Sequence, residues 1–439
     1  MSHHTLDKED FLFSILFFSF FSLTCQKKKK MYRWVFSLLL GSIFLTTLSN
    51  AFDLLGCFQT PIETFFSKKV EQQKHYEQTY LDRANRLLAK HPLVDTHNDF
   101  PMYLAFLRGG KINDLDLTHL EDSHTDLTKI KEGHLGGQMW SIYAPCEMKE
   151  ENQILLAFQS IDAIKRVIAK YPETFEYVTN THEFKKAQRH GKLASTMGLE
   201  GGQYIYNSFA ALRNFYDLGI RYMTLTHNCN TDWSISCCDP NPPSFDRELG
   251  LTEFGHNIVR EMNRIGMMVD ISHVGHSTMH AVLNTTRAPV LFSHSSSNAI
   301  CPIERNVPDN VLQRLDETDG VVMVNFYNHF VQCDPDTPAT LADVANHVEY
   351  IASIAGKHRV GLGADYNGIE VTPEGLEDVS KYPDLFAELI RRGWTKKELK
   401  GLASENFLRV WKRVEQVSEE LKDELPYEED ININVLSYL

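Results

Sequence analysis

The stretch PLVDTHND, residues 92–99, is a short apolar run that ends on two residues able to bind a divalent metal ion, His97 and Asp99. Three further stretches repeat this pattern, each with one metal-binding residue: LASTMGLEGG (193–202, Glu200), MMVDISHVG (267–275, His273) and PVLFSHSSS (289–297, His294). A run of β-branched and large apolar residues is typical of a buried parallel strand. Because the carboxyl ends of such strands form the active site of a barrel, the repeated pattern predicts a metal site there.

The residue types at these strand ends indicate what the site binds. Three imidazoles and two carboxylates are enough for two zinc ions that share one bridging carboxylate. His97 and Asp99 lie two positions apart, so on an extended chain both project to the same side, and we expect them on one ion. The second ion would be bound by His273 and His294, and Glu200 would be shared. An isolated histidine at a strand end is more often structural, but four repeats of one pattern argue against that role.

Strand-like runs alternate with helical segments along most of the chain. The eight runs cover residues 92–97, 138–144, 193–199, 221–226, 267–272, 289–293, 320–326 and 358–364. This alternation predicts parallel pairing and an α/β fold, a single (β/α)₈ TIM-type barrel over residues 52–425, followed by a polar acidic tail at 426–439. An open doubly wound sheet is the alternative. It would spread ligands from the first, third, fifth and sixth strands too widely to form one site.

Three more polar residues follow predicted strands and suggest catalytic roles. Asp365, in HRVGLGADYNG, is placed for proton transfer, although a loop aspartate can instead form an Asx turn. His227, in RYMTLTHN, would donate to a carbonyl oxygen as charge develops there, or be a core histidine. Arg305, in CPIERNVPDN, offers a planar fork suited to a substrate carboxylate. Its alternative is a surface salt bridge with Glu304 or Asp309.

Charge limits the classes of partner. The formal net charge of the 439-residue chain is −14, which argues against nucleic acid because no basic groove is supplied. One basic cluster, the four lysines at 27–30, lies between two apolar stretches at 11–24 and 34–49. We interpret that cluster as a membrane-topology signal rather than a binding patch.

The first 51 residues are expected to be a leader. The segment from Met31 has a short basic start, an apolar centre and small residues near Ala51, the pattern of a secretory signal peptide over 31–51. If translation begins at Met1 instead, the paired apolar stretches would be retained as an N-terminal membrane anchor. Both interpretations place the protein in the secretory pathway, at the cell exterior or the outer face of the plasma membrane.

The eight cysteines fit export. Cys25 belongs to the leader, and the absence of any CxxC pair argues against a structural zinc knuckle. In an oxidising compartment disulfides are the default use of cysteine. Asn284-Thr285-Thr286 is a glycosylation sequon, which is consistent with secretion and with a glycoprotein.

A series of collinear motifs from about residue 75 to 415 resembles the membrane (renal) dipeptidase family. The motifs are VDTHND, GLEGGQ, RYMTLTHNCNTDW, DISHVGHSTM, RAPVLFSHSSS, ERNVPDNVL, MVNFYN and PEGLEDVSKYPDL. The resemblance implies a binuclear zinc peptidase on a (β/α)₈ barrel that hydrolyses dipeptides. It implies that the metal ligands are His97, Asp99, Glu200, His273 and His294. It also implies that the substrate is contacted by His227, Arg305 and Asp365, and that disulfides join Cys146 to Cys229 and Cys301 to Cys333. The partners of Cys57, Cys237 and Cys238 stay unassigned.

Two features depart from well-known relatives. The C-terminal segment has no apolar tail of the length that a glycolipid anchor replaces, and no cysteine follows Cys333 to join two subunits covalently. The sequence is still compatible with a noncovalent homodimer.

The expected activity is zinc-dependent hydrolysis of free dipeptides through a metal-bridging hydroxide, with cysteinyl-glycine-type and glutathione-derived conjugates among the substrates. One rival is another amidohydrolase-type activity, such as a lactonase or deaminase, against which Arg305 argues. The other is a catalytically silent barrel that acts as a receptor or adhesion protein. Such a protein should have lost a metal ligand, and this sequence retains all five.

Overall fold

The barrel is closed by eight parallel strands. The computed structural model describes residues 77–429, so the leader, Cys25 and Cys57 lie outside the described residues. The strands are β1 (Leu93–Asn98), β2 (Leu135–Ile142), β4 (Leu193–Glu200), β5 (Ile220–Thr224), β6 (Met268–Asp270), β7 (Leu291–Phe292), β8 (Val321–Val324) and β9 (Val360–Leu362). Each pairs in parallel with the next, β2 pairs with β4, and β9 pairs with β1 to close the circle. The (β/α)₈ prediction is confirmed, and the open sheet is excluded.

A short ninth strand, β3 (Phe175–Tyr177), is not among the predicted runs. It pairs with residues 193–195 at the start of β4, whereas β5 pairs with residues 197–200 at the end of the same strand. β3 therefore extends the sheet beside the barrel without belonging to its closed circle.

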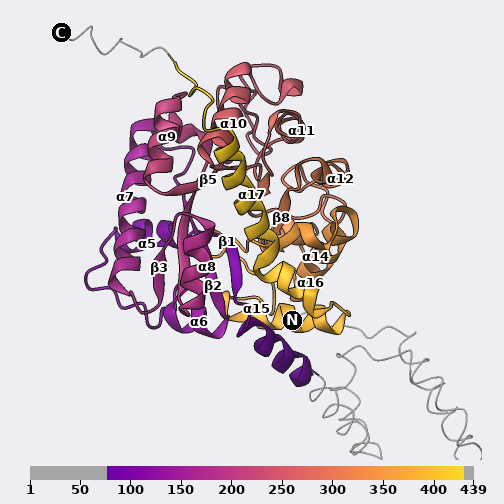
Figure 1. The fold of residues 1–439 in the computed structure, drawn as a ribbon. Helices are drawn as coiled ribbons and strands as arrows, with labels where there is room; N and C mark the ends of the chain where they lie inside the picture. The colour runs from indigo at the N-terminus through magenta and orange to yellow at the C-terminus, as the bar shows by residue number, and fades with distance from the viewer. Residues whose placement is uncertain (1–76, 430–439) are drawn as a thin grey trace, which may run out of the picture. The chain divides into compact units, whose positions relative to one another are not determined.

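Helices surround the strands (Figure 1). A helix over residues 77–88 precedes β1. The others are α5 (Phe100–Arg108), α6 (Leu127–Glu132), α7 (Glu150–Lys170), α8 (Thr181–Arg189), α9 (Phe209–Asp217), α10 (Glu253–Ile265), α11 (His276–Thr285), α12 (Asp309–Thr318), α13 (Asn328–Val331), α14 (Leu341–Ala355), α15 (Tyr382–Arg391), α16 (Lys396–Lys400) and α17 (Asn406–Glu420). Local sequence sets their ends: Thr252 caps the start of α10 by accepting from the Gly255 N–H, and Gly266, at φ 84°, ends it.

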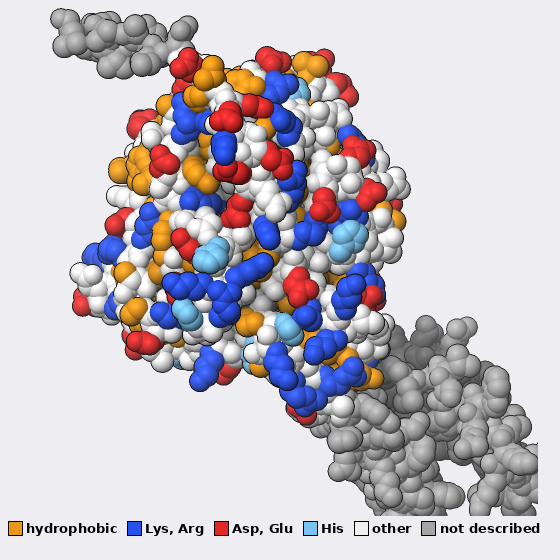
Figure 2. Space-filling view, viewed as in Figure 1, with side chains coloured by type: hydrophobic (Ala, Val, Ile, Leu, Met, Phe, Trp, Pro, Cys, Tyr) orange, Lys and Arg blue, Asp and Glu red, His pale blue; other side chains and the backbone are white. Residues whose placement is uncertain are grey.

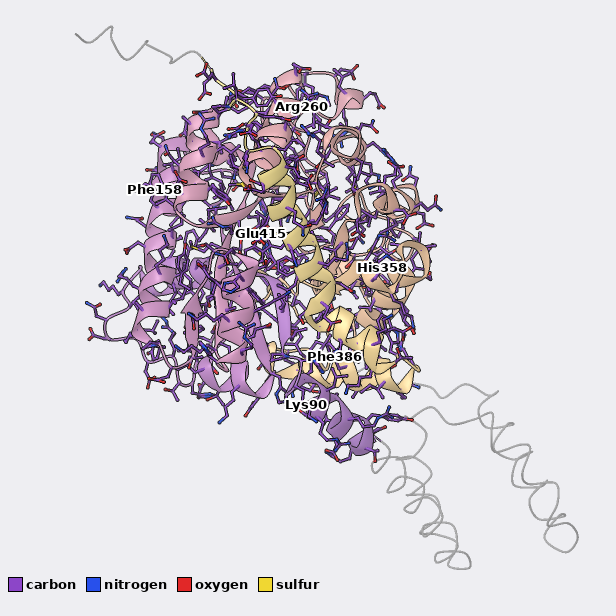
Figure 3. All side chains as sticks on the ribbon, in the orientation of Figure 1. Lys90, Phe158, Arg260, His358, Phe386 and Glu415 are labelled. Atoms are coloured by element: carbon purple, nitrogen blue, oxygen red, sulfur yellow. A yellow bond between two sulfur atoms is a disulfide. The ribbon has the colours of Figure 1, made fainter. Side chains whose placement is uncertain are left out.

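Helix α17 covers the amino ends of the strands. Its Trp411 belongs to an apolar cluster with residues at the first or second position of several strands, among them Val94, Ala194 and Val321. Glu415, labelled on α17 in Figure 3, accepts hydrogen bonds from the backbone N–H and the hydroxyl of Thr181, the first residue of α8. Because this end is sealed by apolar packing, the carboxyl ends of the strands are left for a functional site.

Near the C-terminus, residues from the expected acidic tail contact the barrel helices. The Tyr427 carbonyl accepts from Arg213 of α9, its N–H donates to Glu261 of α10, and its ring lies 5.6 Å from that of Phe209. Glu429 accepts from the Ser208 hydroxyl at 2.6 Å. The first residues of this tail are therefore packed on α9 and α10.

On the face that carries α17, Lys and Arg side chains share the surface with Asp and Glu (Figure 2). One pair lies within α17 itself, Arg413 with Glu420 at 2.6 Å. Within residues 77–429, none of the helices combines the length and the apolar character needed to cross a bilayer.

Candidate active site

The five predicted metal ligands meet at the carboxyl end of the barrel. His97 and Glu200 lie at the ends of β1 and β4, and the other three follow β1, β6 and β7 closely. All five are buried. Glu200 is central: Oε1 lies 3.2 Å from His273 Nε2 and 3.3 Å from His294 Nε2, while Oε2 lies 3.4 Å from His97 Nε2. Asp99 Oδ2 lies 3.4 Å from the same His97 nitrogen. One carboxylate thus faces three imidazoles, as a shared ligand must.

The hydrogen bonds of His273 and His294 direct their free electron pairs toward each other. His273 Nδ1 lies 3.1 Å from Asn228 Oδ1, an acceptor, so this nitrogen carries the proton. His294 Nδ1 lies 2.8 Å from the Ser293 hydroxyl. That hydroxyl already donates its proton to Asp270, so His294 Nδ1 must carry a proton and donate to the hydroxyl oxygen. The two Nε2 atoms are 2.9 Å apart, and in neutral rings both then carry lone pairs. A cation beside them removes that repulsion, so the donor set fits a metal.

His97 has the same arrangement. Its Nδ1 lies 2.9 Å from the Tyr222 hydroxyl, which donates to the Thr96 carbonyl, so Nδ1 is a donor and Nε2 faces the centre. His97 Nε2 and Asp99 Oδ1 are buried without a hydrogen-bond partner. Buried polar atoms rarely stay unpaired, so these two also fit a bound metal.

Electrostatics keep Glu200, His273 and His294 in the forms that metals bind and favour positive charge at His97. Burial, together with nearby positive groups, holds the pKa values of His273 and His294 well below the usual range, so these rings are neutral. Burial alone would raise the pKa of Glu200, but His97 and the other two histidines lower it well below its usual range. For His97, burial acts to lower the pKa, and Tyr222 with the two carboxylates raises it well above normal. The negative charge of the two carboxylates equally favours a metal ion at Nε2.

Two glycines make room for this arrangement. A Cβ atom at Gly198 would lie 1.9 Å from Cζ of Tyr222, so only glycine lets that ring lie over β4 and reach His97. A Cβ atom at Gly368 would lie 2.3 Å from Asp99 Oδ2 and 2.7 Å from Asp365 Oδ1. Both positions therefore require glycine, because site residues lie where a Cβ atom would be.

The backbone is in the left-handed region at two site residues, His273 at φ 60° and Asp365 at φ 71°. Such conformations cost about 1–3 kcal/mol each and persist only where the surroundings fix them. The His273 carbonyl accepts from the Cys237 N–H at 2.8 Å and from the Thr226 hydroxyl at 3.2 Å. These contacts hold the turn that carries the imidazole into the site.

Asp365 lies beside the five predicted ligands. Its Oδ1 is 3.8 Å from His97 Nε2, and its Oδ2 accepts from Asn325 Nδ2 at 3.0 Å. Burial raises the pKa of Asp365 well above its usual range; His97 opposes this effect, and Asp99 and Glu200 add to it. A carboxyl group with a raised pKa suits general acid–base work.

His227 lies on the other side of Glu200, with its Nε2 4.0 Å from Glu200 Oε1. Its ring contacts those of Tyr143 and His273, at centroid distances of 4.8 and 4.4 Å. Burial is the main cause that lowers its pKa, so the ring is a neutral donor. The disulfide of Cys146 adjoins it, with Sγ 4.0 Å from Nδ1.

Arg305 is buried, and it does not form the surface salt bridge left open by the sequence. Glu304 pairs with Arg247 at 2.7 Å instead, and Asp309 accepts from Tyr350. Arg305 donates from Nη1 to the Ser295 hydroxyl and from Nη2 to the His294 carbonyl, and its guanidinium lies 5.2 Å from the Phe330 ring centroid. Burial lowers its pKa to about 10, against the pull of Asp365 and other carboxylates, so it stays charged at neutral pH.

Several supporting residues were not predicted. Asp270 accepts from the hydroxyls of Thr224 and Ser293, each at 2.6 Å, and so ties β5, β6 and the His294 segment together. Asp95 accepts from the His97 N–H at 2.8 Å and from the Tyr382 hydroxyl. Burial raises the pKa of Asp95 to about 6, and the Tyr382 hydrogen bond opposes that rise. A charged residue inside an apolar run was the available signal, because it must have a partner when buried.

Three disulfides lie around the barrel mouth. Cys146–Cys229 and Cys301–Cys333, the two pairs implied by the resemblance, are present with Cα–Cα distances of 6.0 and 5.2 Å. The third joins the adjacent Cys237 and Cys238, which the sequence left unassigned.

Comparison with known proteins identifies the family. Residues 81–425 match the family described as membrane dipeptidase (peptidase family M19). The chain belongs to this family. It is 41% identical over 362 residues to an uncharacterized dipeptidase of Schizosaccharomyces pombe, which covers 79% of this chain and 87% of that protein. It is also 41% identical over 347 residues to dipeptidase 3 of Rattus norvegicus, covering 79% of this chain and 70% of the rat protein.

Solved structures agree with this assignment. A metallopeptidase of Rhodobacter sphaeroides, liganded with a phosphinate mimic of the dipeptide L-Ala-D-Ala, superposes with a TM-score of 0.67 at 25% identity, covering 74% of this chain and 99% of that one. The probable dipeptidase PvdM of Pseudomonas aeruginosa shares the fold, with a TM-score of 0.71 at 20% identity, covering 77% of this chain and 99% of that chain. This member of the membrane dipeptidase family is thus a metal-dependent dipeptide hydrolase.

Proposed function

We propose that this membrane dipeptidase uses two zinc ions and that His97, Asp99, Glu200, His273 and His294 hold them. The observation that carries the proposal is the position of Glu200, whose two oxygens face three imidazole nitrogens at 3.2 to 3.4 Å. Imidazole and carboxylate are the ligands that zinc takes at catalytic sites. When bound, a zinc pair would polarise the scissile carbonyl and supply a hydroxide nucleophile from a shared water near neutral pH.

The other site residues would position the substrate and move its proton. Asp365, with a raised pKa, would deliver the proton to the leaving amine. His227, neutral and beside Glu200, would donate to the oxygen on which negative charge develops. The Asp365 N–H donates to the His97 carbonyl at 3.1 Å and the His227 carbonyl accepts from the Ser236 hydroxyl at 2.6 Å, which supports both main-chain positions.

Arg305 would bind the C-terminal carboxylate of the dipeptide. A guanidinium has five N–H donors, and the hydrogen bonds to Ser295 and His294 use two of them. The Nε atom is buried without a partner, so an acceptor is needed on that side. A carboxylate satisfies such a fork with two parallel hydrogen bonds, so a substrate with a free C-terminus would bind better than an amidated one.

Replacing Arg305 by lysine should raise KM for a free dipeptide about ten-fold or more, because lysine keeps the charge but loses the fork. Steady-state kinetics on dipeptides with free and amidated C-termini measure this effect. Amidation should impair the wild type much more than Arg305→Lys, since the variant has already lost the carboxylate contact.

The matched control is Arg247→Lys, which alters the neighbouring surface pair with Glu304 and should leave KM unchanged. If amidation impaired the wild type and Arg305→Lys equally, another residue would have to bind the carboxylate.

We extend the proposal to the substrates and the compartment. Cysteinyl-glycine-type and glutathione-derived dipeptides are included, because Arg305 and the metal ligands require only a free carboxylate and a scissile carbonyl. Three disulfides support a location at the cell exterior or the outer face of the plasma membrane. The sequon residue Asn284 is exposed at the end of α11, which supports glycosylation there.

A further inference from the structure

The adjacent cysteines 237 and 238 lie beside the proposed metal centre. They belong to the long segment between β5 and α10, where Cys237 is half-buried and Cys238 is exposed. One sulfur from each cysteine and one ring nitrogen of His273 lie within 4.8 Å of one another. The dipeptide hydrolysis proposed for the site makes no use of this sulfur pair.

This bridge adds little to global stability. A disulfide stabilises mainly by closing a loop in the unfolded chain, and its effect grows with loop length. The other two bridges join residues 83 and 32 positions apart, whereas Cys237 and Cys238 are neighbours. The consequence of this bond must therefore be local.

Locally, the two cysteines are tied to two histidines of the site. The Cys237 N–H donates to the His273 carbonyl at 2.8 Å. The Cys238 N–H donates to the Ser236 hydroxyl at 3.1 Å, and that hydroxyl donates to the His227 carbonyl at 2.6 Å. Residues 236 and 274 also form an antiparallel bridge. The sulfurs are thus held near His273 by backbone contacts that do not depend on the S–S bond itself.

We propose that reduction of Cys237–Cys238 creates a second metal site, in which the two thiolates and His273 bind a thiophilic divalent cation. Two sulfurs and one imidazole are a zinc-type donor set with a fourth position left for water. The site goes beyond the dipeptidase activity, since it exists only in the reduced protein and competes with Glu200 for His273.

The reduction requires two molecules of a small free thiol. The first, as thiolate, attacks the exposed sulfur of Cys238, which breaks the S–S bond and releases the Cys237 thiolate. The second attacks the mixed disulfide and leaves with the first as a small-molecule disulfide. Two electrons thus pass to the protein, both cysteines end as thiols, and each releases its proton to solvent when the cation binds.

Cobalt binding tests this site, because thiolate ligands give Co²⁺ an intense charge-transfer absorption that nitrogen and oxygen ligands do not. The full-length enzyme is treated with a mild thiol, and peptide mapping after alkylation of a sample confirms that only residues 237 and 238 have been reduced. The reduced wild type should then bind Co²⁺ with this absorption, about one ion per chain at the two thiolates. The oxidised wild type and the thiol-treated double variant Cys237→Ser/Cys238→Ser should lack it.

A second test uses only the wild-type protein, so it does not depend on whether a variant folds. Alkylation of the reduced wild type before cobalt is added should abolish the absorption. Absence of the absorption in reduced wild type would overturn the proposal. Equal absorption in the double variant would also overturn it, because other cysteines would then supply the thiolates. Equal absorption after alkylation would overturn it as well, because the absorption would then not come from thiolates.

Discussion

Replacing Glu200 by glutamine should lower the metal content from about two ions per chain to less than one and abolish dipeptide hydrolysis. The amide keeps the size of the side chain but has one oxygen instead of two, and its NH₂ group would face an imidazole nitrogen that now faces Oε1 or Oε2. Both ions should be lost together, because the same carboxylate serves both. Elemental analysis of the purified variant, alongside hydrolysis of a free dipeptide, measures the two effects.

The matched control for this variant is Glu248→Gln, a change at an exposed residue that should leave metal and activity as in the wild type. Loss of one ion with full retention of the other would show that Glu200 binds a single ion. Full metal and full activity in Glu200→Gln would exclude any bridging role.

The second large effect is expected for Asp365→Asn, which should reduce kcat roughly 10²- to 10⁴-fold. Asparagine can keep the contact with Asn325 but cannot carry a proton. KM should change little, and the metal content should stay near the wild-type value, because five other donors remain. Pre-steady-state and steady-state kinetics on one dipeptide, together with metal analysis, separate these quantities.

Asp334→Asn, at an exposed loop carboxylate, is the control and should keep the wild-type kcat. An unchanged kcat in Asp365→Asn would remove this residue from proton transfer. A parallel loss of metal would identify it as a ligand, which its 3.8 Å distance from His97 Nε2 makes a concrete alternative.

The barrel was predictable because strands buried on both faces carry continuous apolar runs. Each of the eight runs overlaps a barrel strand, but β6 and β7 are only 3 and 2 residues long. Both strands are shorter than the predicted runs, because strand pairing ends before the residues that place His273 and His294 in the site. β3 has 3 residues and pairs only with the start of β4, so no periodicity could reveal it.

The site was predictable only in part. His97, Glu200 and His294 follow from their positions at strand ends, and the structure brings them together. The supporting contacts of Ser293 and Asn228 were not predictable, because a sequence does not show which polar atoms meet across strands. The burial of Arg305 was also left open, since its partners, the Ser295 hydroxyl and the His294 carbonyl, lie 10 and 11 positions away in a loop without periodicity.

The pairing of neighbouring cysteines shows the same limit. Adjacent residues carry no information on whether their sulfurs bond to each other or to distant partners, and Cys57 added a third candidate. In the structure Cys237 is bonded to Cys238, and their backbone N–H groups donate to the His273 carbonyl and the Ser236 hydroxyl.

Titration of metal-free enzyme with zinc, while the hydrolysis of a free dipeptide is followed, tests the binuclear site most directly. A shared Glu200 predicts that activity rises until about two zinc ions per chain have been added and then stays constant. Full activity at one ion per chain, or activity in the metal-free protein, would contradict a two-zinc mechanism.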